Sequence, residues 1–336
     1  MFATVLGAIP RPPSKTDEPL GDDDAVRAVI AAQEAAGLDL LTDGRIRWSD
    51  ELGLGLASEL VGSGSTERLV DEWLFAHTAA TRPVKQSLPG PYTAGRRLSD
   101  RAPARDRRRE QLTETIAARL NAAVRSLTDA GCVFIEVEEA DAGEIGEDEA
   151  ERALFVRAHR RLTGDASGVH LSLALTRGSA DRAGTATFLD APYASYALDV
   201  IVGPDNWRLA PRFPGERGIV CGALDARASS DDTRELLVWA ANYAASTGRR
   251  GLDRVGLAIV PGLVKQDWTT VERKLTRLGE AARLAALSGE ELKSEMDPRA
   301  VDIRSAALGR YEPGHGELRG NEPGRNRPRR RPRRPR

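Results

Sequence analysis

Gly131-Cys132-Val133-Phe134-Ile135-Glu136-Val137-Glu138-Glu139 is the stretch that decides the fold, because it runs from a turn glycine through an apolar strand into a group of carboxylates. Side chains alternate between the two faces of a strand, so Glu136 and Glu138 lie on the same face. A buried strand tolerates two carboxylates on one face only where a partner or a substrate compensates their charge. The stretch therefore predicts a polar site at the carboxyl end of a buried strand.

Apolar runs with the length of strands alternate with helical patterns along most of the chain. The helical patterns have a period of 3.6; the first, for example, begins at the acids Asp22-Asp23-Asp24 and ends at Gly37. The expected strands, eight in number, are Ala3–Ile9, Leu38–Thr42, Pro83–Leu88, Cys132–Glu138, Val169–Thr176, Leu198–Val202, Gly218–Leu224 and Val255–Val260. Eight strand–helix units without a second sheet pattern predict an α/β fold of the (β/α)8 type, a TIM barrel.

The predicted barrel spans residues 1–290, and the chain beyond it divides into two parts. Residues 291–318 form a C-terminal extension. Residues 319–336 contain nine arginines and one acid, a net charge of +8, so the other 318 residues carry −9 of the overall −1. Prolines interrupt this basic tail, which cannot bury apolar surface, so we predict that it is disordered and contacts anions nonspecifically. The acidic body argues against specific binding of nucleic acid.

The composition of the 336 residues predicts a cytoplasmic protein. No apolar run reaches the roughly eighteen residues that a membrane helix needs, so no membrane partner is expected. The N-terminal segment Met1–Leu6 lacks the basic start of a signal peptide. The two cysteines, Cys132 and Cys221, lie in different expected strands without a metal-type spacing, so we expect free thiols in a reducing compartment.

The chemistry of a parallel barrel sits at the carboxyl ends of its strands. In this chain those ends carry acids and arginines, and neither histidine nor cysteine. The candidates for substrate binding or catalysis at these ends are Asp43, Arg45, Arg47, Glu138, Arg177, Asp205 and Asp225. This set predicts a polar mouth that suits a small acidic substrate.

Five fragments of the chain, in order, resemble the C-terminal domain of cobalamin-independent methionine synthase. The family's patterns are T-D-G-E, P-V-K…G-P-x-T, A-G…I-Q-I-D-E-P, G-x-V-D and G-L-x…W…K-L. The matching fragments are Thr42-Asp43-Gly44, Pro83-Val84-Lys85 with Leu88–Thr93, Ala130–Glu139, Gly222–Asp225, and Gly262-Leu263 with Asp267-Trp268 and Lys274-Leu275. The resemblance covers most of residues 1–287. It implies a barrel of the superfamily that also contains uroporphyrinogen decarboxylase.

The zinc of that family is held by histidine, glutamate and two cysteines, and it turns a bound thiol into a thiolate. On the fifth expected strand, the family's H-x-C element corresponds either to His170 and Ser172 or to Ala174 and Thr176. We prefer the second register, because it lies at the strand's carboxyl end. The family's second cysteine is replaced by Pro261, and only Asp205 stands near the expected glutamate. We therefore predict that this chain lacks the zinc ligands and binds no metal.

The family's acceptor site is altered as well. The glutamate of T-D-G-E is Arg45, the serine of the first strand's I-G-S is Ala8, and the aspartate of the fourth strand is Glu138. Two interpretations of Arg45 stay open. The guanidinium binds a carboxylate or phosphate of the substrate, or it neutralises Glu138 or Glu136 across the barrel mouth.

Three functions follow from these departures. The first is a metal-independent enzyme on an acidic substrate, similar to uroporphyrinogen decarboxylase and its lyase chemistry. In it, Arg45 or Arg47 holds a carboxylate and Glu138 is the general acid or base. Glu136 and Glu138 are about 6–7 Å apart along the strand, close enough for one to raise the pKa of the other.

The second function is transfer of a methyl or alkyl group without zinc, with a folate as the donor. Lys85 and Thr93 are retained from the resemblance, whereas Arg96-Arg97 replaces an aromatic–polar pair. The third is a non-catalytic protein that binds a ligand or partner. Across the three, the catalytic candidates are Glu138, Glu136 and Arg45, and Lys85 and Thr93 join the substrate-binding candidates.

Overall fold

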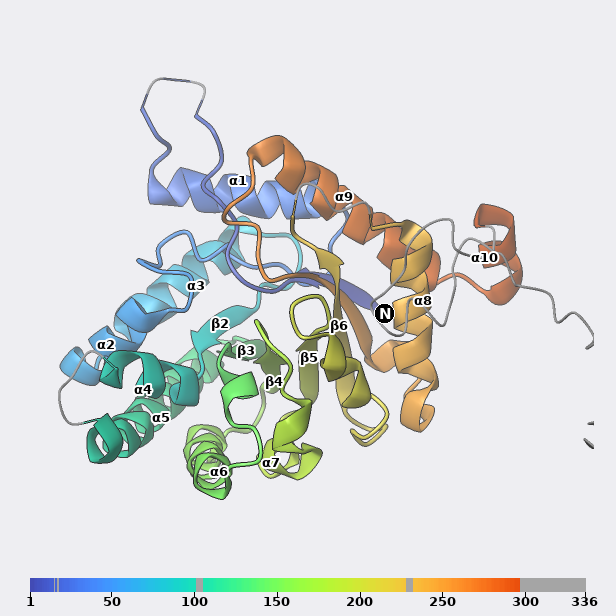
Figure 1. The fold of residues 1–336 in the computed structure, drawn as a ribbon. Coiled ribbons are helices and arrows are strands. Elements are labelled where there is room, and N and C mark those ends of the chain that lie inside the picture. The colour runs from blue at the N-terminus through green and yellow to red at the C-terminus, as the bar shows by residue number, and fades with distance from the viewer. Residues whose placement is uncertain (15, 17, 101–104, 228–231, 297–336) are drawn as a thin grey trace, which may run out of the picture.

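The computed structural model describes residues 1–14, 16, 18–100, 105–227 and 232–296 (Figure 1). It has a curled sheet of seven parallel strands in the order β1-β7-β6-β5-β4-β3-β2. The strands are β1 Phe2–Val5, β2 Gln86–Pro89, β3 Phe134–Glu139, β4 His170–Leu175, β5 Ser195–Asp199, β6 Gly218–Asp225 and β7 Val255–Val260. The sheet confirms the predicted α/β class.

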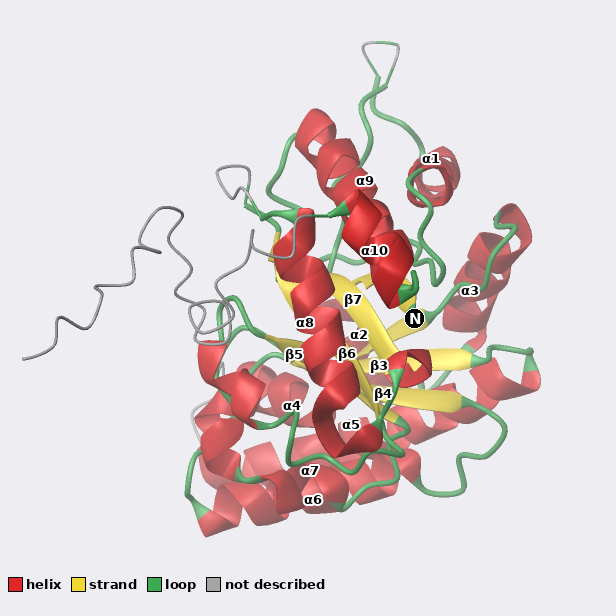
Figure 2. Cartoon of the chain, turned by 90° about the vertical axis from the view of Figure 1, so that its right-hand side faces the viewer, coloured by secondary structure: helices red, strands yellow, loops and turns green. Residues whose placement is uncertain are grey.

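Helices follow the strands and cover the outside of the curl (Figure 2). The α-helices are α1 Asp22–Ala35, α2 Leu54–Ser63, α3 Glu67–Ala79, α4 Pro91–Ser99, α5 Arg105–Asp129, α6 Glu149–Thr163, α7 Thr185–Leu189, α8 Arg234–Ser246, α9 Trp268–Ala285 and α10 Gly289–Glu295. The 3-10 helices are η1 Ala142–Glu144, η2 Asp181–Ala183, η3 Pro204–Arg208, η4 Thr247–Arg249 and η5 Leu252–Arg254. None of the helices that the structure describes is both long and apolar enough to span a membrane.

The expected strand at residues 38–42 does not form, because side chains take up backbone groups that a ladder would use. The Asp39 carboxylate accepts from the N–H of Ala3 at 3.0 Å, and the Gln33 amide exchanges two hydrogen bonds with the backbone of Thr42. What remains is a single parallel bridge between Leu41 and Val84. The prediction of eight strands is therefore wrong, and the described chain has seven.

The segment 38–42 nevertheless contacts both edges of the sheet. The N–H of Leu40 donates to the carbonyl of Ala3 in β1 at 3.2 Å. The N–H of Lys85, directly before β2, donates to the carbonyl of Leu41 at 2.9 Å. The two edge strands thus share one irregular neighbour.

The sixth expected strand, Leu198–Val202, forms as β5 with different bounds. β5 ends at Asp199, three residues before the expected end at Val202, because the Asp199 carboxylate accepts from the N–H groups of Ile201 and Val202. Those N–H groups then cannot continue the ladder. The shift moves Asp199 from the expected strand interior to the strand's carboxyl end.

The two faces of the sheet bury different sets of side chains. Outward residues such as Ile135 and Val137 join the large core under the helices. Inside the curl, a smaller apolar cluster forms from Leu6, Ala174, Ala197, Val220, Ala258 and Val260. Glu136 and Glu138 share this inner face, because they alternate with Ile135 and Val137 along β3. The C-terminal extension and basic tail fall mostly at residues 297–336, outside the described residues.

Candidate active site at the carboxyl ends of the strands

Glu138 lies near the carboxyl end of β3 and forms a buried ion pair with Arg45. The Arg45 Nη1 atom donates to Glu138 Oε2, and the two side chains are 1% and 4% exposed. The Thr176 hydroxyl, just after β4, donates to the other Glu138 oxygen at 2.7 Å. One of the two open interpretations of Arg45, neutralisation of Glu138, is therefore present as an ion pair, and it joins the carboxyl end of β3 to the turn after residues 38–42.

Arg45 is held in an unusual conformation and has unused donors. Its φ of 56° lies in the left-handed region, where its backbone N–H donates to the Asp43 carboxylate at 2.9 Å. The guanidinium stacks on the Trp48 ring, 4.6 Å from the ring centre. Its Nε and Nη2 atoms are buried and have no hydrogen-bond partner in the part of the chain that the structure describes. The residue is thus fixed in place with part of its binding capacity unsatisfied.

The pKa of Glu138 is lowered from its ordinary value. Burial raises this pKa, but the charge of Arg45, the Thr176 hydroxyl and the charge of Arg177 together outweigh burial. Glu138 therefore stays ionised at neutral pH and can accept a proton. Of the two carboxylates predicted to couple, Glu138 is therefore not the one with a raised pKa, because Arg45 compensates its charge.

Glu136 forms the second buried pair, with Lys85. The Lys85 Nζ atom donates to Glu136 Oε2 at 2.7 Å, and both side chains are buried. Burial lowers the pKa of Lys85, and the neighbouring charge of Arg45 acts in the same direction, against the attraction of Glu136. The pair lies deeper along the strands than Glu138, so Lys85 and Glu136 act first as internal compensation for each other.

Asp199 is a residue of the site that the sequence analysis missed. It is fully buried at the carboxyl end of β5, and its Oδ2 accepts from the N–H of Arg177 at 3.0 Å. Burial raises its pKa, and the charge of Glu138 adds to the rise. The signal was present, since Asp199 follows the apolar run Tyr196–Leu198, but the strand was placed three residues too late.

Arg177 reaches over the mouth toward Glu51. Its Nη2 atom donates to Glu51 Oε2 at 2.8 Å, and its φ of 62° is again left-handed. Glu51 belongs to the segment between the Trp48 turn and α2, and its backbone carbonyl accepts from Arg45 at 3.1 Å. Glu51 thus contacts both mouth arginines and is a second residue that the sequence analysis missed.

Three predicted binding residues point elsewhere. Arg47 pairs with Asp23 of α1 at 2.5 Å, and Asp205 pairs with Arg208 at 3.1 Å and is half exposed. The Thr93 hydroxyl donates to Glu139 at 2.5 Å, in a cluster between β3 and α4. Their predicted roles in the mouth are therefore not supported by their contacts.

The two remaining candidates lie at strand ends. Asp225 ends β6, is buried, and accepts from the Arg227 Nε at 2.7 Å. Asp43 is buried beside Arg45, whose turn it holds. Both contribute to the rim without touching Glu138 in the contacts that the structure gives.

Glu139 completes a separate network outside the sheet. Its carboxylate accepts from the N–H groups of Tyr92 and Thr93 at the start of α4, at 2.9 and 2.8 Å. His159 Nε2 lies 2.9 Å from the same carboxylate, and His159 Nδ1 lies 2.6 Å from the Tyr193 hydroxyl. This network ties α4 and α6 to β3 and serves the fold rather than the mouth.

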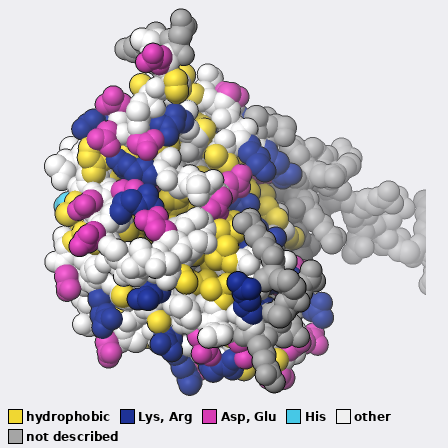
Figure 3. Space-filling view, turned by 90° about the vertical axis from the view of Figure 1, so that its left-hand side faces the viewer, with side chains coloured by type: hydrophobic (Ala, Val, Ile, Leu, Met, Phe, Trp, Pro, Cys, Tyr) yellow, Lys and Arg dark blue, Asp and Glu magenta, His cyan; other side chains and the backbone are white. Residues whose placement is uncertain are grey.

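A cavity of about 280 Å³ adjoins Arg45. Its lining includes Ile9, Arg11, Trp48, Asp50 and Glu51. In Figure 1, β1 runs from the N-terminus toward the left, so Figure 3 shows the face at the carboxyl ends of the strands. Basic and acidic side chains are interspersed on this face around a hydrophobic area. The cavity is a partly covered site close to small-molecule size, with both polar and apolar side chains in its lining.

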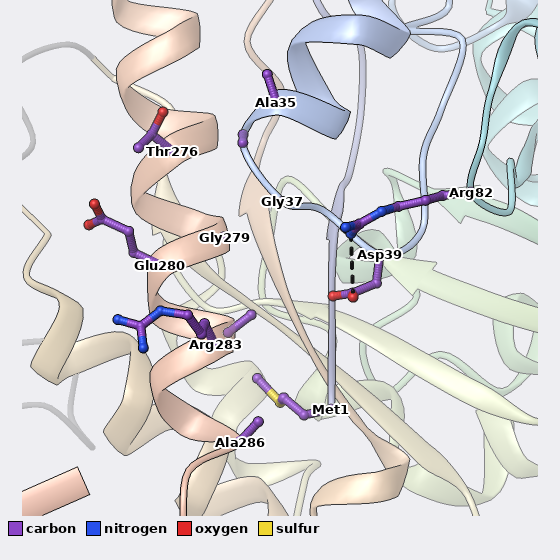
Figure 4. A pocket seen from close by; sticks show the side chains of 12 residues that line it. Met1, Ala35, Gly37, Asp39, Arg82, Thr276, Gly279, Glu280, Arg283 and Ala286 are labelled. Carbon is purple, nitrogen blue, oxygen red and sulfur yellow. Dashed lines mark ion pairs between the residues drawn. The ribbon is translucent and has the colours of Figure 1, made fainter. Parts of the chain in front are cut away.

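A larger cavity of about 500 Å³ lies at the opposite end, where Met1 precedes β1 (Figure 4). α1 and α9 form its walls, and Arg82 pairs with Asp39 inside it at 3.7 Å. The buried polar atoms without a partner, among the described residues, are not on the residues that line it. It lacks the unsatisfied donors that mark the Arg45 cavity.

The residues at the strand ends do not fit a zinc ion. In the preferred register of the resemblance, the ligand positions correspond to Ala174, Thr176 and Pro261. The described residues contain no group of three or more histidine, cysteine, aspartate or glutamate side chains that could hold a metal. Cys132 and Cys221 are buried, and burial raises their pKa to about 11 and about 12. Neither thiol is poised as a thiolate.

His170, the ligand of the other register, lies at the start of β4, away from the mouth. It stacks on Phe134, with the ring centres 4.4 Å apart, and its Nε2 is 2.8 Å from the Ser195 hydroxyl. Burial lowers its pKa. These contacts are those of a structural histidine.

Comparison with solved structures supports the expected fold. No protein-family model matches the chain, and no curated protein matches it. A B12-independent methionine synthase from Shewanella sp. W3-18-1, solved with selenomethionine, superposes with a TM-score of 0.65 at 17% identity, covering 87% of this chain and 98% of that one. A putative vitamin-B12 independent methionine synthase from Listeria monocytogenes gives a TM-score of 0.61 at 16% identity, with 85% and 96% covered. The chain therefore has the fold of these methionine synthases, at an identity that shows the fold alone.

Proposed function

We propose that this protein is a metal-independent enzyme that acts on a small acidic molecule in the Arg45 cavity. The observation that carries the proposal is the buried Arg45 guanidinium, which neutralises Glu138 and still has two donors without a partner. These two atoms have almost no accessible surface in the free protein, so a carboxylate entering from the adjoining cavity would bind them in the paired geometry that guanidinium favours once the surrounding side chains shift. Arg45 could thus both neutralise Glu138 and bind a substrate carboxylate, so the two interpretations left open by the sequence are compatible.

Proton transfer is the chemistry that the mouth supports best. The pKa of Glu138 is lowered and that of Asp199 is raised, so their surroundings separate the pKa values of two nearby carboxyl groups. Such a difference assigns the first group as the base and the second as the acid. Thr176 and Arg177 connect them, since the hydroxyl of one bonds Glu138 and the N–H of the other bonds Asp199. A lyase or decarboxylase acting on a carboxylic acid would use this arrangement.

Group transfer is the second candidate, and the fold favours it. The similar structures are methionine synthases, and a barrel of this kind could move a methyl or alkyl group to an acceptor, with a folate as donor. Without zinc, an acceptor would need another means of activation, for which Glu138 is the candidate base. Zinc-dependent methylation of a thiol does not agree with the residues present.

We also infer that residues 38–42 complete a barrel and that the protein works in the cytoplasm. The hydrogen bonds from this segment to both sheet edges support closure. A closed wall would leave the carboxyl-end mouth as the way to Glu138.

The experiment is hydrogen exchange of three- to six-carbon carboxylic acids in D₂O, followed by proton NMR. The enzyme should exchange a carbon-bound hydrogen of at least one acid, and Glu138→Gln should reduce that rate by about 10²-fold or more. Arg45→Gln should abolish binding of the same acid. Arg160→Gln, which removes an exposed arginine paired with Asp190, is the control. Binding without exchange would favour the non-catalytic alternative, and equal rates in wild type and Glu138→Gln would refute the base assignment.

A further inference from the structure

We propose that Arg45 and Arg177 form a two-ended site for a five-carbon dicarboxylate, and that Glu51 of the chain itself fills this site in the free protein. The inference rests on the proposed function, because it takes the Arg45 cavity as the substrate site. It adds a second anchoring point and therefore a substrate class.

Glu51 has the shape of such a ligand between the two arginines. Its backbone carbonyl oxygen accepts from Arg45 Nη1 at 3.1 Å, and its carboxylate accepts from Arg177 Nη2 at 2.8 Å. Lys265 Nζ is 3.9 Å from the other carboxylate oxygen. Within a glutamate residue, five carbons connect the carbonyl to the carboxylate oxygens, which is the skeleton of glutarate. The distance between the two guanidinium groups therefore suits a five-carbon diacid.

The arginines are left unsatisfied by this internal occupant. Arg45 Nε and Nη2 and Arg177 Nε are buried and have no partner among the described residues. A neutral carbonyl takes one hydrogen bond from Arg45, whereas a carboxylate would accept two and bring a charge. A dicarboxylate would thus gain contacts that Glu51 cannot provide.

Both arginines are also fixed by their backbones. Their φ angles of 56° and 62° are left-handed, a conformation that non-glycine residues hold only when their surroundings impose it. At each turn an aspartate carboxylate accepts from the backbone N–H of the arginine. Asp43 accepts from Arg45, and Asp199 accepts from Arg177. The guanidinium groups are therefore presented from rigid turns, which reduces the entropy lost on binding.

The Glu51 carboxylate can be displaced from Arg177. The Glu51 side chain is 32% exposed, and its partners Arg177 and Lys265 are 30% and 81% exposed. An ion pair with this exposure changes an equilibrium constant by no more than about fivefold. The turn that carries Glu51 is held by the Asp50 carboxylate, which accepts from the N–H groups of Leu52, Leu54 and Gly55. The Glu51 carboxylate can leave Arg177 without breaking those bonds, whereas the Glu51 carbonyl shares a peptide unit with the N–H of Leu52 and stays on Arg45, so the first carboxylate of a ligand would bind the unpartnered Nε and Nη2 of Arg45.

The test compares glutarate with pentanoate, which differ in the second carboxylate alone, by titration calorimetry. Wild type should bind glutarate about tenfold more tightly or better, and Arg177→Gln should bring this ratio close to one. Glu51→Gln should tighten glutarate about fivefold, because it removes the competing carboxylate. Glu59→Gln and Arg160→Gln, which break exposed ion pairs with Arg68 and Asp190, should leave the ratio unchanged.

Each outcome separates the two proposals. The second anchor is overturned if wild type binds glutarate and pentanoate equally, or if Arg177→Gln leaves the ratio of the two affinities unchanged. In either case, loss of pentanoate binding in Arg45→Gln leaves the Arg45 site standing. Unchanged binding of both acids in Arg45→Gln overturns both. Succinate and adipate should bind several-fold more weakly than glutarate, and equal affinities would overturn the five-carbon length. Should Arg177→Gln not fold, unchanged glutarate affinity in Glu51→Gln overturns the inference alone.

Discussion

Replacing Arg45 by methionine would leave the Glu138 carboxylate buried without its cation while keeping an apolar side chain of similar length against Trp48. Both members of the pair are almost fully buried, and loss of one partner from such a pair costs about 3–5 kcal/mol. The Thr176 hydroxyl still donates to Glu138, so we expect the lower end, about 3 kcal/mol. For a chain of this size that lowers the Tm by roughly 6–10 °C.

The pH dependence identifies the cause. In the wild type the pKa of Glu138 is lowered, so the stability it contributes is present above its unfolded pKa and is lost as pH falls through the folded value. Without Arg45, burial would raise this pKa, and the carboxyl would take up a proton as pH falls from 8 to 5. The difference in free energy of unfolding between Arg45→Met and wild type should therefore shrink over that range.

Urea unfolding followed by circular dichroism at pH 8, 6.5 and 5 measures both effects. Adding Glu138→Gln to Arg45→Met should recover about 2 kcal/mol, since the buried carboxylate without its cation is then removed. Arg45→Glu, which restores the residue of the resembling family, should destabilise further, because a third carboxylate joins Glu136 and Glu138. Arg160→Met, at an exposed pair, should leave the Tm unchanged. A loss below about 0.5 kcal/mol at pH 8, or one that is the same at every pH, would refute the coupling.

Three further predictions test the surroundings of the site. Lys85→Met should cost about 3 kcal/mol in the free energy of unfolding, and the double variant with Glu136→Gln should recover most of it; no recovery would mean that Lys85 acts through packing. Gly90→Ala should destabilise by about 2–3 kcal/mol in the same assay, because its new Cβ would lie 2.1 Å from the Glu139 carboxyl carbon. Gly62→Ala in α2, whose Cβ meets nothing within 4 Å, should instead stabilise by up to about 1 kcal/mol, and equal effects at the two glycines would contradict the clash. Elemental analysis of the purified protein should find well under one zinc per chain, and a stoichiometric amount would contradict the ligand argument.

The order of strands and helices was accessible from the sequence, because it depends on local periodicity. Apolar runs of strand length alternate with patterns of period 3.6, and seven of the eight expected strands formed near their expected positions. The exception at residues 38–42 failed because the Gln33 amide bonds its backbone at Thr42 and its own Asp39 carboxylate takes the N–H of Ala3 in β1. Composition does not reveal such bonds, since they depend on where α1 and β1 lie beside the segment.

The position of the site was accessible for the same reason. Strand alternation put Glu136 and Glu138 on one face, and the rule that parallel strands end on a common edge put Arg45 near them. Asp199 was missed through a boundary error of three residues, which moved it away from the strand end. The boundary of a strand depends on the hydrogen bonds of single side chains, which a pattern of apolar residues does not reveal.

The partners of the site residues were decided by the tertiary structure alone. Arg45 and Glu138 are 93 residues apart, Lys85 and Glu136 are 51 apart, and Arg177 and Glu51 are 126 apart. Whether a cation lies beside the buried Glu138 carboxylate decides whether its pKa is lowered or raised, and here the arginines lower it. The sequence by itself determined that acids and arginines gather where the strands end, Glu138 and Arg45 among them, because strand periodicity and strand ends are local. Only packing of the whole sheet decided which charges would meet, because electrostatic energy depends on distances that no local pattern contains.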